Sequence, residues 1–130
     1  MAEMSDVEVV AAIYEAMAAK DLERLIELIS PRIVVDQDPA LPWGGHFEGH
    51  EGFGEFAMLL TGTIDSAVAI DAIFQAGDEV FQMGHTKGTV LANGATFDVP
   101  EVHRWRIEEG KAVKADFAID TALMLEALGA

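Results

Sequence analysis

The sequence contains no cysteine, which excludes a disulfide framework and thiolate chemistry. Basic residues are scarce as well: 8 Lys and Arg stand against 23 Asp and Glu, so the formal net charge at pH 7 is −15. A surface of that charge repels phosphate backbones and anionic lipid headgroups. We therefore expect neither a nucleic acid nor a membrane surface as a partner, and we interpret the acidity mainly as a source of solubility.

Long apolar runs are also missing. No stretch approaches the roughly 20 apolar residues that a membrane-spanning helix needs. The N-terminal sequence MAEMSDVEVV is acidic and lacks the basic region and apolar run of a signal peptide, so the expected location is the cytoplasm. Apolar residues make up 51% of the 130 positions, which suits a single folded domain over residues 1–130.

What the sequence does contain is one stretch of clear alternation, ATFDVPEVHRWRI, from Ala95 to Ile107. Alternation with period two predicts a strand with one buried side. The side chains that share that side are Phe97, Val99, Glu101, His103, Trp105 and Ile107. Burying a carboxylate or an imidazole without partners is costly. Glu101 and His103 therefore indicate that the fold encloses a cavity at this strand.

Helical patterns fill the first half of the chain. Ser5, followed three residues later by Glu8, forms a capping box that opens a helix running to about Lys20. Asp21 caps a second helix, which we expect Ser30-Pro31 to end because proline cannot continue the hydrogen-bond ladder. A β-branched strand, a loop rich in proline and glycine, and a third helix follow over residues 32–38, 39–49 and 51–60.

From Thr63 onward the pattern changes to strands. The turn signals Gly77-Asp78, Asn93-Gly94 and Glu109-Gly110 separate four strand candidates, over residues 66–75, 79–91, 95–107 and 112–119. Asp120 or Thr121 caps a last helix over residues 122–128, which Gly129 stops. Helices followed by antiparallel strands predict an α+β fold, with the helices packed on one face of a curved sheet.

Three segments carry a resemblance to a known superfamily: LPWGGHFEGHEGFGEF, VHRWRIEEGKAV and FAIDTALMLEAL. Together with the order of elements, they make the chain similar to the cone-shaped NTF2-like proteins, and within them to SnoaL-like and ketosteroid-isomerase-like proteins. The resemblance implies a strongly curved mixed or antiparallel sheet, N-terminal helices on its concave face and a deep apolar pocket. It also implies a homodimer that forms through the convex face of the sheet.

The same resemblance implies candidate catalytic residues. Ketosteroid-isomerase-like proteins carry a tyrosine on the first helix and a catalytic aspartate directly before a proline, and Tyr14 and Asp38 match these positions. The third position, an aspartate in those enzymes, is held here by His103. The implied roles are a base at Asp38, whose pKa a dry pocket would raise, and oxyanion donors at Tyr14 and His103. Glu101 is the alternative base.

Other carboxylates remain open as the key acid or base. Asp36 shares the parity of Asp38, and SnoaL-type cyclases and epoxide hydrolases use acids on late strands, where Asp116 and Asp120 lie here. Alternation places Asp116 on the convex side, together with Arg104 and Arg106, which argues against hydrolase chemistry. Asp120 suits a helix N-cap. A purely structural role is the alternative for each: a turn residue at Asp38, a core tyrosine at Tyr14 and a mutually satisfied Glu101–His103 pair.

Eight further residues are expected to line the pocket: Trp43, His46, Phe53, Phe56, Met83, His85, Trp105 and Phe117. His85 shares the parity of Met83, and we expect it to face the Glu101–His103 region across the ladder. Trp43 could belong to a lid or simply anchor its loop. His46 and His50 stand four apart in a glycine-rich loop and not on a helix, so no metal site is expected there.

These residues predict an acid–base enzyme of the isomerase or cyclase type for a small, mainly apolar molecule that bears oxygen. Asp38 or Glu101 would move a proton beside a carbonyl, while Tyr14 and His103 stabilise the enolate oxygen. The sequence has no nucleotide motif, and no cofactor is expected. The alternative is a non-catalytic module that binds a small ligand in the same pocket.

Overall fold

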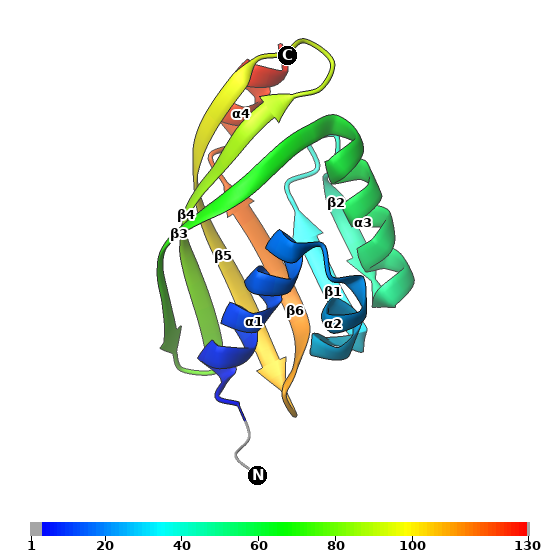
Figure 1. The fold of residues 1–130 in the computed structure, drawn as a ribbon, viewed down its shortest axis with the longest axis vertical. Helices are drawn as coiled ribbons and strands as arrows, with labels where there is room; N and C mark the ends of the chain where they lie inside the picture. Colours follow the sequence, from blue (N-terminus) through cyan, green and yellow to red (C-terminus); the bar gives the residue numbers. More distant parts are fainter. Residues whose placement is uncertain (1–3, 130) are drawn as a thin grey trace.

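The computed structural model describes residues 4–129, so the first three residues of the acidic N-terminal stretch lie outside the described residues. Its elements follow the predicted order, with most of the helices in the first half of the chain and then a run of long strands (Figure 1). In chain order they are α1 (Asp6–Ala19), α2 (Leu22–Leu28), β1 (Ile29–Gln37), β2 (Gly45–Glu48), α3 (Gly49–Thr63), β3 (Ile64–Ala76), β4 (Glu79–Val90), β5 (Thr96–Glu108), β6 (Lys111–Ile119) and α4 (Thr121–Leu128).

Within residues 4–129, six strands form one mixed sheet in the order β2-β1-β6-β5-β4-β3. β1 and β6 run parallel, and the other neighbouring strands are antiparallel. The sheet is strongly twisted; α1 and α2 lie against one of its faces, and α3 runs beside β2 at its edge (Figure 1). The predicted α+β class, with helices on one face of a curved sheet, is confirmed.

Most helix ends lie close to the predicted ones, although α3 spans Gly49–Thr63 and not residues 51–60, and one end is an exception because the predicted stop lies in a strand. Ser5 and Glu8 form the expected capping box of α1. Asp120 caps α4, and Gly129 ends it. The exception is α2, which ends at Leu28, so the prediction that Ser30-Pro31 terminates a helix is wrong. These two residues belong to β1, where the pairing with β6 is irregular between Ile29 and Val34, and proline is tolerated at such irregularities.

A second correction concerns residues 39–49, which the sequence predicts to be a loop. Gly45–Glu48 form β2, which pairs with β1 from Val34 opposite Glu48 to Gln37 opposite Gly45. The strand has only four residues and lies among glycines, so it has little local strand signal of its own. Pairing with β1 supplies the hydrogen bonds that the local sequence does not predict.

The alternation of β5 is confirmed. Its inward side chains from Phe97 to Ile107 are all buried, and the side chains between them are exposed or half-buried. The helix that covers this region, α1, buries Val9, Val10 and Ile13 completely. Polar residues on the inward face of β5 are therefore enclosed between the sheet and α1.

Two glycines of β4 allow β3 to fold closely over it. A Cβ atom at Gly84 would lie 2.1 Å from the carbonyl oxygen of Ala69, and one at Gly88 would lie 2.0 Å from that of Asp65. A backbone can approach this closely only where no side chain stands. The two glycines thus permit the tight coiling of β3 and β4 that curls the sheet.

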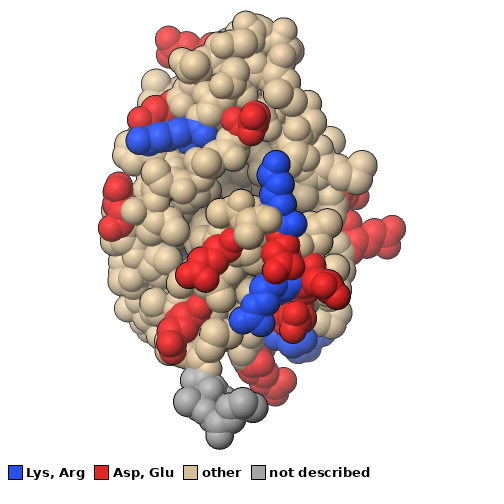
Figure 2. Space-filling model, in the orientation of Figure 1, with Lys and Arg blue, Asp and Glu red and all other residues tan. Residues whose placement is uncertain are grey.

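Acidic side chains are scattered over the face shown in Figure 2, with few basic ones among them, in keeping with the net charge of −15. The same view shows that this face is hollowed near its centre. In the part of the chain that the structure describes, no helix is both long and apolar enough to cross a membrane.

Replacement of Gly84 by alanine should destabilise the fold by about 2 kcal/mol or more, because the new methyl group would meet the backbone of Ala69. The matched control is Gly54→Ala in α3, where an added Cβ has no neighbour within 4 Å. That change should stabilise the protein by roughly 0.5–1 kcal/mol. Urea denaturation measures both; a Gly84→Ala protein as stable as the wild type would contradict the role given to this glycine.

Candidate functional site

The inward face of β5 and the facing side of α1 bring together a cluster of buried polar side chains. Glu101 is 4% exposed, His103 6% and Tyr14 5%. β4, the neighbour of β5, adds Gln82, which is fully buried, and Thr86, which is half-buried. The three residues Tyr14, Glu101 and His103, predicted from different parts of the sequence, do lie together in the structure.

The donors around the Tyr14 oxygen determine which atom accepts its hydroxyl hydrogen. Its oxygen accepts from the indole Nε1–H of Trp105 at 3.0 Å and from the amide nitrogen of Gln82 at 3.3 Å. The same oxygen lies 2.7 Å from Nδ1 of His103. An indole and an amide nitrogen can only donate. The Tyr14 hydroxyl therefore donates a hydrogen bond to Nδ1, and His103 carries its own hydrogen on Nε2.

His103 is neutral in this environment. Burial lowers the pKa of its imidazole to about 3, because the charged form would lose its hydration. Burial likewise raises the pKa of the Tyr14 hydroxyl, so Tyr14 keeps its proton. The Nε2–H group of His103 points toward Glu101 at an Nε2–Oε1 distance of 3.4 Å, longer than an ordinary hydrogen bond. The Nε2–H group is therefore free to donate a stronger hydrogen bond to a ligand.

Glu101 is held by its neighbours on β4. The Thr86 hydroxyl donates to Oε1, and the Gln82 amide nitrogen donates to Oε2. Burial raises the pKa of this carboxyl, while the two hydrogen bonds act in the opposite direction. The carboxylate thus has a stronger affinity for a proton than an exposed glutamate, as a general base near neutral pH requires.

Aromatic rings surround the His103 end of the cluster. The Phe117 ring stands edge-on to His103 at 4.8 Å and to Trp105 at 5.3 Å, and it stacks on Phe56 at 5.2 Å. Phe53 continues this aromatic group at the half-buried side of α3. Trp43 is 2% exposed and belongs to the core, which favours its role as the anchor of its loop.

The dry surroundings expected for Asp38 are not found. Asp38 is exposed, and its carboxylate accepts from the Ala40 amide at 2.9 Å and from the Thr121 hydroxyl at 3.2 Å. These contacts describe a turn residue directly after β1. Within residues 4–129, the carboxylate that the fold buries is that of Glu101.

Met83 and His85 were predicted to face the same cavity as Glu101, and this is wrong. On β4 the inward positions are Val80, Gln82, Gly84 and Thr86, so Met83 and His85 project from the other face. Met83 is 43% exposed. His85 contacts the carboxylate of Asp98 at 2.6 Å. The imidazole of His85 therefore lies on the opposite face of the sheet from that of His103.

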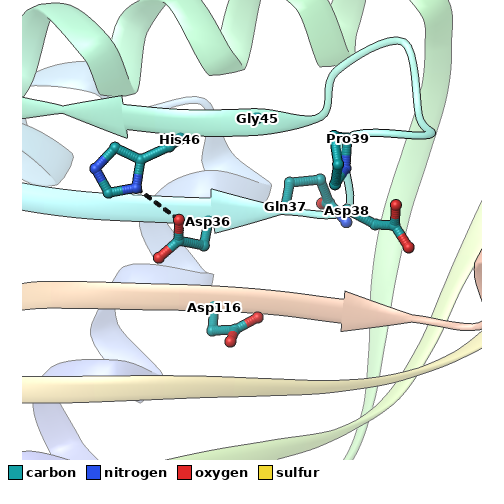
Figure 3. A pocket seen from close by; sticks show the side chains of 7 residues that line it. All are labelled: Asp36, Gln37, Asp38, Pro39, Gly45, His46 and Asp116. Atoms are coloured by element: carbon teal, nitrogen blue, oxygen red, sulfur yellow. Dashed lines mark hydrogen bonds and ion pairs between the residues drawn. The ribbon is translucent and has the colours of Figure 1, made fainter.

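His46 also lies on the outer face of the sheet. It bridges the carboxylates of Asp36 at 2.7 Å and Glu48 at 3.0 Å, and these hydrogen bonds raise the pKa of its exposed imidazole. Figure 3 shows His46 pointing toward Asp36, with Asp116 on the adjacent strand, around a surface hollow. The prediction that His46 lines the inner pocket is wrong, because β2 turns this side chain outward.

The two remaining candidate carboxylates, those of Asp116 and Asp120, make structural contacts. Asp116 faces outward, as its parity predicts, and pairs with Arg104 at 3.1 Å. Asp120 accepts from the Leu123 amide at the start of α4, as expected of an N-cap. Among residues 4–129, no group of three or more His, Asp or Glu side chains is arranged to hold a metal ion.

Gln82 and Thr86, both partners of Glu101, are not among the residues predicted from the sequence. The sequence does contain a signal for their inward position, because Gln82 and Thr86 share one face of β4 with Val80 and Val90. It was obscured because Phe81 and Met83, on the opposite face, are apolar as well. Hydrophobicity alone could not decide which face of β4 is inside.

Protonation of His103 should couple folding to pH. The unfolded chain binds this proton below about pH 6.5 and the folded chain only near pH 3, so stability falls as pH decreases through this window. At pH 4.5 the loss from this group amounts to roughly 2–3 kcal/mol. Urea denaturation at pH 7 and 4.5 should show a smaller loss for His103→Gln than for the wild type; equal losses would contradict a buried, neutral His103.

Comparison with known proteins gives the chain a family context. No curated protein matches it. An NTF2-like protein of unknown function from Burkholderia pseudomallei is 28% identical, with a TM-score of 0.87 over 98% of this chain and 100% of that one. An NTF2-like protein from Burkholderia thailandensis is 26% identical, with a TM-score of 0.88 over 96% and 98% of the two chains.

A third similar structure is IdmH from Streptomyces antibioticus, described as a candidate polyketide cyclase. It is 26% identical, with a TM-score of 0.76 over 97% of this chain and 100% of that one. A family model described as a SnoaL-like domain matches residues 10–115. This match covers most of the chain, including Tyr14, Gln82, Glu101 and His103, and the protein therefore belongs to the SnoaL-like domain family, with the NTF2-like fold.

Proposed function

We propose that this protein is a cofactor-independent acid–base enzyme of the isomerase or cyclase type, acting on a small apolar molecule that bears oxygen. One observation carries the proposal: a buried carboxylate oxygen of Glu101 lies 3.4 Å from the Nε2 of a neutral His103. This arrangement sets a proton acceptor beside a proton-bearing hydrogen-bond donor. Enolisation next to a carbonyl needs both groups at once.

In this reaction Oε1 of Glu101 takes a proton from the carbon next to the substrate carbonyl. The C–H electron pair moves into the new C=C bond, and the carbonyl oxygen becomes an enolate that accepts from the Nε2–H of His103. The glutamic acid then returns the proton at another carbon, which gives the isomer. Alternatively, the enolate carbon attacks a second carbonyl carbon of the substrate and closes a ring, while the electron pair of that C=O bond moves onto its oxygen, which takes the proton back from the glutamic acid. Tyr14 acts through His103, because its hydroxyl hydrogen is already donated in the hydrogen bond to Nδ1.

The surroundings support an apolar substrate. Trp105, Phe117 and Phe56 are buried beside the polar cluster. Half-buried apolar side chains, such as Met17, Phe53 and Ile119, pack against the same core. The description of IdmH as a candidate polyketide cyclase supports a polycyclic or polyketide-like class of substrate for this chain too.

A non-catalytic binding module is the second candidate, and the closure of the cluster favours it. The Glu101 side chain has no exposed surface, and His103 keeps 8% of its side chain exposed. Ligand entry therefore passes the His103 edge and requires neighbouring side chains to move. A ligand that is only bound needs to contact only the exposed edge of His103, whereas the substrate of an enzyme must also reach the carboxylate of Glu101.

We also infer a homodimer formed through the outer face of the sheet. Three large apolar side chains there are about two-fifths exposed: Phe74 at 43%, Met83 at 43% and Val102 at 40%. Met83 and Val102 stand opposite each other on β4 and β5, and Phe74 stacks on Phe81 beside them. A contiguous apolar patch of this kind suits a protein partner.

Exchange of carbon-bound hydrogen in D2O tests the enzyme directly. With a β,γ-unsaturated cyclic ketone or an aromatic β-diketone as the probe, the protein should accelerate deuterium incorporation at the α carbon by on the order of 10²-fold or more over buffer. Glu101→Gln should abolish the acceleration and still bind the probe, because the amide keeps the shape but accepts no proton. NMR follows both exchange and binding.

The matched control is Asp38→Asn, which should exchange the probe at the wild-type rate because Asp38 is exposed and bonded to Ala40 and Thr121. Full activity in Glu101→Gln, or loss of activity in Asp38→Asn alone, would contradict the assignment of the base. Binding of probes without any exchange would favour the non-catalytic module.

The assembly has a separate test. Sedimentation should give the mass of a dimer for the wild type and of a monomer for Val102→Glu, because a buried unpaired carboxylate opposes association. Met58→Glu places the same charge on α3, where Met58 is 75% exposed, and should leave the dimer intact. A monomeric wild type would end this inference.

A further inference from the structure

Gln82 occupies the centre of the polar cluster. It lies on the inward face of β4 and is fully buried. Its amide nitrogen contacts three groups: Oε2 of Glu101, the hydroxyl oxygen of Tyr14 at 3.3 Å and Nδ1 of His103 at 3.3 Å. Among residues 4–129, no other side chain makes hydrogen bonds to all three residues of the proposed mechanism.

The direction of this amide follows from the charges around it. If the amide were turned over, its carbonyl oxygen would face the Glu101 carboxylate, and two acceptors would repel each other. With the nitrogen toward Glu101, the carbonyl oxygen lies near Gly84 and is buried without a hydrogen-bond partner. Leaving such an atom unpaired is unfavourable. The contacts on the nitrogen side therefore determine how the residue is oriented.

The amide hydrogens act on both halves of the site. One donates to Glu101 and stabilises its ionised, proton-accepting form. The other points at the Tyr14 oxygen and toward Nδ1 of His103. A hydrogen on Nδ1 would meet this amide hydrogen, so the amide disfavours the Nδ1–H tautomer and leaves the hydrogen of His103 on Nε2.

We propose that Gln82 is the positioning residue of this site: its amide nitrogen keeps Glu101 ready to accept a proton and keeps the donor hydrogen of His103 on Nε2. The proposal rests on the proposed function for its catalytic meaning, but its physical content concerns two protonation states that exist without any substrate. It accounts for why a fully buried glutamine with an unpaired carbonyl oxygen stands at this position.

Polar and charged groups surround Glu101 from several elements, and Asp71 and Asp120 line the surface hollow that Glu101 borders. α1 contributes Tyr14, β5 contributes His103, and β4 contributes Gln82 and Thr86. On β6, the neighbour opposite Glu101 is the apolar Ile119. His85 acts on Glu101 from the outer face of the sheet and lowers its pKa slightly against the effect of burial. A change in the titration of Glu101 can thus be traced to these side chains.

The test compares Gln82→Met with two controls. Methionine has nearly the same length and shape but no N–H donor. Gln37→Met is the matched buried control, because Gln37 is 6% exposed on β1 and donates only to the carbonyl oxygen of Phe117. Thr86→Val removes the other donor to Glu101 without touching Tyr14 or His103. NMR of ¹⁵N-labelled imidazole reports the His103 tautomer, and ¹³C NMR of the carboxyl reports the titration of Glu101.

In the wild type the spectrum should show His103 as the Nε2–H tautomer at pH 7. Gln82→Met should raise the pKa of Glu101 and produce a measurable fraction of Nδ1–H. Thr86→Val should raise the pKa of Glu101 alone, and Gln37→Met should change neither. Where a probe is turned over, Gln82→Met should lower kcat by about tenfold to a hundredfold, with KM nearly unchanged.

An unchanged tautomer and titration in a folded Gln82→Met protein would overturn the proposal, as would an Nδ1–H or doubly protonated His103 in the wild type. If Gln82→Met does not fold, Gln82→Leu gives the same comparison, and an Nδ1–H wild-type spectrum overturns the proposal without any variant. These readings need no turnover, so a failure of Gln82 as a positioning residue is distinguishable from a failure of the proposed enzyme activity.

Discussion

The structure depends on one constraint: two ionisable side chains lie on the buried face of β5, and the protein itself must supply their partners. Water cannot hydrate Glu101, whose side chain is fully covered. An unpaired buried carboxylate is among the most unfavourable features that a fold can contain. Thr86 and Gln82 from β4 answer that need for Glu101, and Tyr14 from α1 does so for His103.

Burial acts on this pair in opposite directions. It raises the pKa of Glu101 and lowers that of His103, so the usual order of a glutamate and a histidine is driven toward reversal. In water the two would form an ion pair; here the histidine stays neutral and its N–H serves as a donor. Environments that shift the pKa values of two neighbouring groups in opposite directions are typical of acid–base sites. The apolar rings around Phe117 maintain this environment.

Much of the fold was predictable because its signals are local. Ser5, Asp21 and Asp120 are caps recognisable within four residues, and the alternation of β5 places Glu101 and His103 inside without any tertiary information. The family resemblance added Tyr14, which the structure places 2.7 Å from His103. Other features required long-range contacts. β2 exists only through its pairing with β1, and Asp38 bonds to Thr121, 83 positions away. Apolar residues stand on both faces of β4, with Val80 inward and Phe81 and Met83 outward, which hid Gln82 and suggested His85 instead.

Neutron diffraction of a deuterated crystal tests the central claim most directly, because it locates the exchangeable hydrogens of the cluster. At neutral pH the account predicts deuterium on Nε2 of His103, none on Nδ1, and a Tyr14 O–D group directed at Nδ1. Glu101 should be a carboxylate that accepts from Thr86 and Gln82. Deuterium on Nδ1, or on both ring nitrogens, would contradict the account.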